Sequence, residues 1–211
     1  MDKAIWYDWN GGNVWLFKLI NGINGGNYYD LAMRQITMLG DKKILPYLLA
    51  VVAAYALTNW IYKIIAKKGG SKHYAIMWIS CAIVFAASFA CTYITTNTLK
   101  NHFAYPRPYV ALASDEVQLL ISPTEENGNQ SFPSGHVTII ATLIFAIWPL
   151  LGEGFRVFGA ATIFAVAWSR IALGVHFPVD VLASFFICLI EVYFVRGILH
   201  SVWRTLFGAR I

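Results

Sequence analysis

Three short runs hold most of the residues in this chain whose types and spacing could support chemistry. The runs are Lys100 to Arg107-Pro108, Pro133-Ser134-Gly135-His136, and Ser169-Arg170 through His176 to Asp180. They gather cations, two histidines, a carboxylate and serine hydroxyls in a chain that is 58% hydrophobic and only 13% charged. Charged groups are costly near a bilayer, so this concentration predicts a functional site. Cations beside histidines suit the binding of a phosphate group and the cleavage of its ester bond.

The cationic and small residues of these runs fit a phosphate-binding role. Attack on a phosphate ester spreads negative charge over the equatorial oxygens, and fixed donors stabilise that charge. Arg107 and Arg170 carry planar guanidinium groups that match phosphate, and Lys100 adds a point charge. Ser134 offers a hydroxyl donor, and Gly135 at a helix start lets an anion approach the backbone amides.

The two histidines are left for the bond-forming and bond-breaking steps. His176 lies four residues before Asp180, so one helical turn brings the carboxylate to the imidazole and fixes its tautomer. We therefore expect His176 to be the nucleophile that forms a phosphohistidine. His136 has no acid close in sequence. We expect it to protonate the leaving oxygen and then to activate the water that cleaves the intermediate.

The composition predicts that these residues are positioned by membrane-spanning helices of a single domain. Soluble domains average about 25% charged residues, roughly twice the fraction seen here. A helix needs about 20 apolar residues to cross a bilayer. Five segments approach that length, namely 44–65, 74–99, 137–151, 155–172 and 179–199. We predict an all-α polytopic bundle of five to six transmembrane helices, with residues 41–200 as its core and 201–211 as a cytoplasmic tail.

The first 40 residues differ from the rest of the chain. Segments 13–23 and 28–39 have apolar faces, but Lys18, Asp30 and Arg34 interrupt them. The preferred interpretation is a pair of amphipathic helices lying on the membrane surface. One imperfect additional span is the alternative. Within the last span, we expect the isolated acid Glu191 to pair with Arg196 or to snorkel to the interface.

The loop charges predict how the bundle is oriented. One side of the membrane receives Lys63, Lys67, Lys68, Lys72, Arg156, Arg196, Arg204 and Arg210. Loops rich in lysine and arginine stay in the cytoplasm. An opposing group of cations precedes the first span, where neighbouring acids largely offset it. The three runs then fall at helix ends on the other, outer face, where they can meet in one site.

Taken together, the three runs resemble the tripartite signature of the type 2 phosphatidic acid phosphatase superfamily, and every signature position is filled. The resemblance implies a metal-independent phosphatase without a cofactor. It implies His176 as nucleophile and His136 as proton donor. The implied phosphate contacts are Lys100, Arg107, Ser134, Gly135 and Arg170, with Ser169 as a phosphate or structural contact. A metal site is also disfavoured on chemical grounds, because the surrounding residues are mostly cationic.

The small size and the predicted orientation resemble those of bacterial members that act on undecaprenyl pyrophosphate. This resemblance implies an inner-membrane enzyme of the cell envelope whose site faces the periplasm. Phosphatidylglycerol phosphate, phosphatidic acid and lipid A stay open as substrates, as does phosphate transfer to a second lipid. A non-catalytic transporter or scaffold is a further alternative. We expect loop 109–132 to contribute to substrate choice, the bilayer and a lipid phosphate to be the partners, and nucleic acid not to bind.

Overall fold

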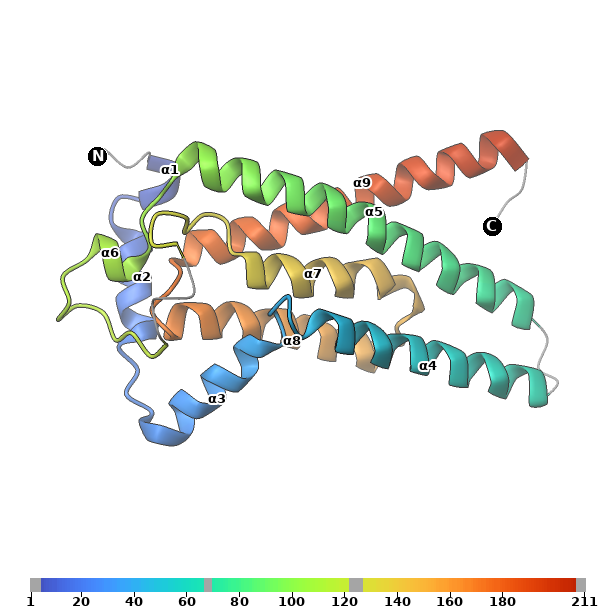
Figure 1. Cartoon of the computed structure of the whole chain (residues 1–211), viewed down its shortest axis with the longest axis horizontal. Helices are drawn as coiled ribbons and strands as arrows, with labels where there is room; N and C mark the ends of the chain where they lie inside the picture. The colour runs from blue at the N-terminus through green and yellow to red at the C-terminus, as the bar shows by residue number, and fades with distance from the viewer. Residues whose placement is uncertain (1–4, 67–69, 122–126, 208–211) are drawn as a thin grey trace.

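The structure is a computed structural model that describes residues 5–66, 70–121 and 127–207, and the regular elements within these residues are all helices (Figure 1). This confirms the predicted all-α membrane fold. The helices are α1 (Ile5–Asp8), α2 (Gly12–Asn21), α3 (Gly26–Met38), α4 (Leu45–Ile65), α5 (Ser71–Phe103), α6 (Pro108–Ala111), α7 (Gly135–Ile147), the 3-10 turn η2 (Trp148–Leu150), α8 (Glu153–Ala172) and α9 (Pro178–Phe207).

Four of the five predicted spans are long and apolar enough to cross a bilayer, namely Leu45–Ile65, Lys72–Ala111, Glu153–Ala172 and Pro178–Thr205. The last helix runs past its predicted end, so residues 201–207 of the predicted tail are helical. The predicted span 137–151 instead forms the shorter apolar helix Gly135–Leu150. Its length is about 25 Å, compared with a hydrocarbon core of about 30 Å.

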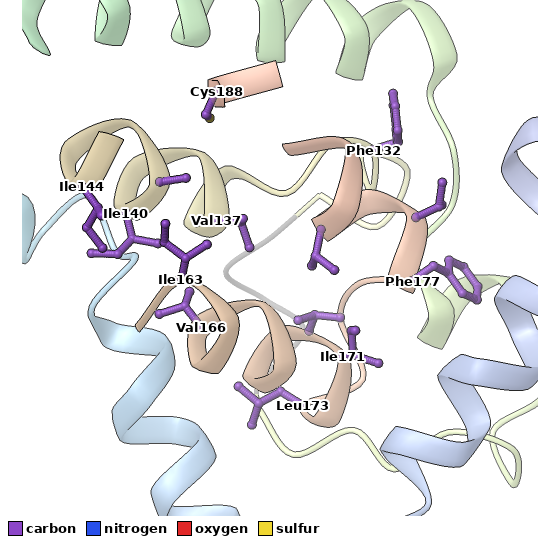
Figure 2. Packing of buried hydrophobic residues seen from close by; sticks show 14 of the residues in the cluster. Phe132, Val137, Ile140, Ile144, Ile163, Val166, Ile171, Leu173, Phe177 and Cys188 are labelled. Carbon is purple, nitrogen blue, oxygen red and sulfur yellow. The ribbon is translucent and has the colours of Figure 1, made fainter. Parts of the chain in front are cut away.

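Helix α7 is short because it forms the centre of the bundle rather than its lipid-facing wall. Nine of its thirteen residues are buried, and it packs against α5, α8 and α9 (Figure 1). In the core, Val137 and Ile140 of α7 lie beside Ile163 and Val166 of α8 (Figure 2). The central position of α7 brings its first residues between the ends of its three neighbours.

Helix α4 stands at the edge of the bundle and has no buried residue. Its packing contacts are mainly with α5, and apolar side chains such as Tyr47, Val51 and Ile65 are strongly exposed, as expected for a helix with one face toward lipid.

The N-terminal helices cap the bundle instead of only lying on the membrane surface. Among the described residues before Leu45, no helix is long enough to span a bilayer, so the alternative of an additional span gains no support. Helices α2 and α3 both pack on α8. Asn13, Phe17 and Asn21 are buried by this packing, and the Phe17 ring lies 5.3 Å from that of Phe177. One face of this segment is therefore used by protein rather than by lipid.

The expected pairing of Glu191 with Arg196 is not formed. Glu191 Oε1 accepts a hydrogen bond from Thr95 Oγ1 at 2.6 Å. Arg196 Nη2 instead donates to the carbonyl oxygens of Phe145 and Ala146, each at 2.9 Å. The physical reason is that α7 ends here, and the last carbonyl groups of a helix lack partners within it.

Candidate active site

The three runs meet at one end of the bundle, where α5 and α8 end and α7 and α9 begin (Figure 1). The backbone N–H of Ser134 donates to the carbonyl oxygen of Asp180 at 3.2 Å, which joins the second run to the third. Arg107 Nη1 lies 3.2 Å from His176 Nε2, which joins the first run to the third. Residues far apart in sequence thus share one buried site.

The predicted nucleophile and its acid form the centre of this site. His176 Nδ1 lies 3.3 Å from Asp180 Oδ2, and the two side chains are 1% and 0% exposed. Because the carboxylate can only accept, Nδ1 carries the proton and Nε2 holds the lone pair. Nε2 is the ring atom that faces Arg107. The imidazole is therefore oriented with its nucleophilic nitrogen toward the cationic residues.

The environment keeps the His176 imidazole uncharged. Burial lowers its pKa well below the ordinary value of 6.5, and repulsion from the neighbouring cationic groups lowers it further. In order of effect, these groups are Arg107, Arg170, Lys100 and His136. A neutral imidazole retains the lone pair that an attacking group needs.

Asp180 is held in place by donors from three parts of the chain. Its Oδ2 accepts from Ser131 Oγ at 2.6 Å and from the backbone N–H of Phe177 at 2.9 Å. Its Oδ1 accepts from the hydroxyl of Tyr7 at 3.0 Å. A carboxylate with its lone pairs occupied in this way presents His176 with a fixed acceptor.

The first run is anchored on backbone carbonyl groups of the loop that follows it and of the third run. Lys100 Nζ and Arg107 Nη2 both donate to the carbonyl oxygen of Gln130, at 2.7 Å and 3.3 Å. Arg107 also donates to the carbonyl oxygens of Asn127 and Val175, at 2.9 Å and 3.0 Å. These bonds fix the guanidinium group beside His176.

The start of α7 has the features of an anion site. Ser134 Oγ is buried and forms no hydrogen bond within the part of the chain that the structure describes. A Cβ built on Gly135 would meet no atom within 4 Å, so open space lies beside the first helical residue. A buried hydroxyl without a partner in the protein can donate to a bound group. Helix N-terminal amides favour a negatively charged one.

Arg170 is buried at the end of α8 and is tied to both neighbouring segments. Its Nη1 donates to Thr37 Oγ1 of α3 at 3.0 Å. Its carbonyl oxygen accepts from the backbone N–H groups of Val175 and His176, both at 3.3 Å. Gly174 in this turn has a φ of +80°, and a Cβ there would lie 2.7 Å from a backbone oxygen of the 112–121 loop. The turn therefore requires glycine.

Ser169 differs from the other predicted phosphate contacts. Its hydroxyl donates to the carbonyl oxygen of Val166 at 2.8 Å, and the side chain is fully buried. Its donor is thus used within its own helix, which suits the structural contact that the resemblance allowed.

His136 opens onto a cavity of about 720 Å³ that Gly135 and Arg170 also line. The turn after α3 presses against this histidine. A Cβ on Gly40 would lie 2.8 Å from the Cβ of His136 and 2.6 Å from its carbonyl oxygen. Only glycine allows this close approach.

Sequence reasoning did not find Tyr7, Ser131, Thr37 or Gly40. Tyr7 is 1% exposed. Burial, followed by the nearby Asp180 carboxylate, raises its pKa, so its hydroxyl stays a donor. The bond joins residues 173 positions apart, and no local pattern marks such a partner. Ser131 had a weak signal, since it lies two residues before the second run.

Loop 109–132, which is predicted to influence substrate choice, is held to helix α2 by several contacts of its described residues. Asn21 Nδ2 donates to the carbonyl oxygen of Gln118 at 2.8 Å, and Asn21 Oδ1 accepts from the backbone N–H of Gln118 at 2.8 Å. Lys18 Nζ lies 2.6 Å from Glu116 Oε1. Ile121 lines the cavity beside His136. Residues 122–126 of this loop, and Lys67 and Lys68 of the lysine-rich turn, lie outside the described residues.

Comparison with known proteins shows the family and the fold. The PAP2 superfamily model matches residues 82–204. An Escherichia coli (strain K12) protein named "Putative undecaprenyl-diphosphatase YbjG" is 29% identical over 174 residues, which are 82% of this chain and 75% of that protein.

Two crystal structures share the fold. Aquifex aeolicus LpxE is 24% identical and has a TM-score of 0.62, with 93% of this chain and 97% of that chain covered. The PAP2 type phosphatidylglycerolphosphate phosphatase from Bacillus subtilis is 21% identical and has a TM-score of 0.61, with 92% and 87% covered. With the family match covering more than half of the sequence, the chain belongs to the PAP2 superfamily and is a metal-independent membrane phosphatase.

Proposed function

We propose that this protein hydrolyses a lipid diphosphate, with undecaprenyl pyrophosphate converted to undecaprenyl phosphate as the specific reaction. The observation that carries the chemistry is the buried His176, whose Nδ1 faces Asp180 and whose Nε2 faces Arg107. The choice of lipid is supported by the name of the Escherichia coli relative, a putative undecaprenyl-diphosphatase.

The first half of the reaction transfers the terminal phosphoryl group to the enzyme. Lys100, Arg107 and Arg170, together with the Ser134 hydroxyl and the amides after it, bind the phosphoryl oxygens. His176 Nε2 forms a bond to phosphorus while the bond from phosphorus to the leaving oxygen breaks. The His136 proton passes to that oxygen, so the lipid leaves as its monophosphate.

The second half restores the enzyme. Neutral His136 takes a proton from a water molecule, whose oxygen bonds to phosphorus as the N–P bond breaks. Inorganic phosphate leaves, and His136 is protonated again. Asp180 stabilises the charge that develops on the His176 ring, and it does not exchange a proton in either half.

The proposed location is the bacterial inner membrane, with the site at the outer, periplasmic face. Lys63 at the end of α4 and Lys72 at the start of α5 lie at the opposite end of the bundle (Figure 1). The positive-inside rule assigns that end to the cytoplasm. A lipid substrate can then present its headgroup to helix ends without leaving the bilayer.

The test is phosphate release by the purified full chain in detergent. The substrates are undecaprenyl pyrophosphate, phosphatidylglycerol phosphate, phosphatidic acid and lipid A, each with and without a chelator. We expect the diphosphate to react fastest, the chelator to have no effect, and a phosphoenzyme that is labile in acid but stable in base. Release of inorganic phosphate without a second lipid separates hydrolysis from transfer. Full activity in His176→Ala would contradict the mechanism.

A further inference from the structure

The cavity beside His136 has a basic rim that the reaction described above does not use. Arg34 of α3 and Lys42 and Lys43 of the following turn line the same cavity as His136 and Arg170. All three basic side chains are exposed. They come from the N-terminal part of the chain, outside the three signature runs.

These three cations are available for a ligand. Within the residues that the structure describes, none of their side chains forms an ion pair or hydrogen bond. Asp41 is the acid in the described cavity lining. Its Oδ1 accepts from the backbone N–H of Lys43 at 2.8 Å, and its carbonyl oxygen accepts from the N–H groups that begin α4. The rim therefore keeps an excess of positive charge.

The basic rim is held against the reacting groups. Gly40 touches the backbone of His136, and Thr37 accepts a hydrogen bond from the buried Arg170. Both contacts lie within the few residues that precede Lys42 and Lys43. The backbone that leads into this turn is thus anchored beside the proton donor, and both lysines line the same cavity as His136.

The cavity lies on the leaving-group side of the site. His136, which protonates the leaving oxygen, lines the cavity, whereas the nucleophile His176 does not. In phosphoryl transfer the attacking and leaving atoms are roughly in line, so the leaving group departs on the side away from the nucleophile. A leaving group that is a neutral alcohol gains nothing from three cations. One that keeps a phosphate of its own gains an ion-binding surface.

We propose that Arg34, Lys42 and Lys43 form a subsite for a phosphate that stays on the leaving group, which makes lipid diphosphates the preferred substrate class. The inference rests on the proposed function and deepens it. In a diphosphate, the bond from the terminal phosphorus to the bridging oxygen breaks, and His136 gives its proton to that oxygen. The phosphate that remains on the lipid is then held by the basic rim until the product leaves.

The experiment compares a prenyl diphosphate with the prenyl monophosphate of the same chain length, using the purified full chain in detergent. In the Arg34→Gln/Lys42→Gln/Lys43→Gln variant we expect kcat/KM for the diphosphate to fall about tenfold, mainly through KM, because three exposed ion pairs that are each modest add up to an effect of that order. For the monophosphate we expect a change below about twofold. The lipid monophosphate product should also inhibit the variant less than the wild type.

The matched control removes the same number of cations from the opposite end with Lys63→Gln/Lys72→Gln/Arg204→Gln, and it should leave both substrates unaffected. If the triple rim variant does not fold, Lys42→Gln/Lys43→Gln alone tests the same difference. Equal losses on both substrates, or no loss on the diphosphate, would overturn the subsite. Failure of the proposed function is seen separately, as a wild-type enzyme that releases no phosphate from the diphosphate.

Discussion

The two ends of the helix bundle treat their charged side chains in different ways. At the active-site end, Arg107, Arg170 and Asp180 are buried, and segments distant in sequence supply their hydrogen bonds. At the opposite end, Lys72 is exposed, and Lys63 lies over the ring of Tyr74 at 4.8 Å. Buried charges with fixed partners can shift a pKa and orient a reaction, whereas the exposed lysines of the opposite end mainly set how the bundle sits in the membrane.

The largest expected effect is the loss of the nucleophile. His176→Ala should lower kcat at least about 10⁴-fold, because no other group forms the covalent intermediate. Phosphate release measures the loss, and the phosphoenzyme should disappear with it. A variant that still forms a base-stable phosphoenzyme would show that the nucleophile lies elsewhere.

The second largest effect is expected for Asp180→Asn, which should lower kcat about 10²- to 10⁴-fold. The amide can donate to His176, which would move the ring proton to Nε2 and remove the nucleophilic lone pair. KM should change little, since the phosphate contacts stay in place. A large rise in KM with unchanged kcat would instead assign Asp180 to substrate binding.

Tyr7→Phe tests whether the N-terminal helix α1 helps to position the catalytic groups at the active-site end of the bundle. A hydrogen bond to a charged group contributes about 1.5–3 kcal/mol, so we expect kcat to fall about tenfold or more while KM is maintained. The control is Tyr28→Phe, which changes a side chain that is 90% exposed. Equal effects in the two variants would remove Tyr7 from the list of positioning residues.

Stability should depend on pH through His176. Its pKa in the folded protein lies well below 6.5, so the folded state binds fewer protons than the unfolded chain. The stabilisation is complete above about pH 6.5 and is lost as the pH falls toward the folded pKa. Between about pH 7.5 and about pH 5, the wild type should therefore lose more stability than His176→Gln in thermal unfolding. Identical losses would argue against a neutral buried imidazole.

The smallest effect is expected at the opposite end of the bundle. Lys72→Gln should change kcat/KM by less than about twofold, because an exposed cation far from the site is screened by salt. A larger loss of phosphate release would mean that the two ends are coupled.

The apolar segments and the signature runs could be predicted from the sequence because both are local patterns in it. The spans follow from uninterrupted apolar length, and the positions of the runs at helix ends follow from the spans. The short length and central position of α7 could not be predicted, because an apolar segment has the same sequence pattern whether lipid or neighbouring helices cover it. The role of Asn13 shows the same limit. It accepts from the N–H of Val179, 166 residues away, yet in sequence it looks like part of a polar surface.

The hydrogen bond from Tyr7 to Asp180 also has a practical consequence for handling the protein. The first described helix, Ile5–Asp8, touches the catalytic pair, whereas α9 ends at the far side of the bundle (Figure 1). An affinity tag or fluorescent fusion joined before Ile5 would be attached close to the helix whose Tyr7 holds Asp180. The described end of α9 lies at the far side of the bundle, so a fusion at the C-terminus is the safer choice for expression and assay.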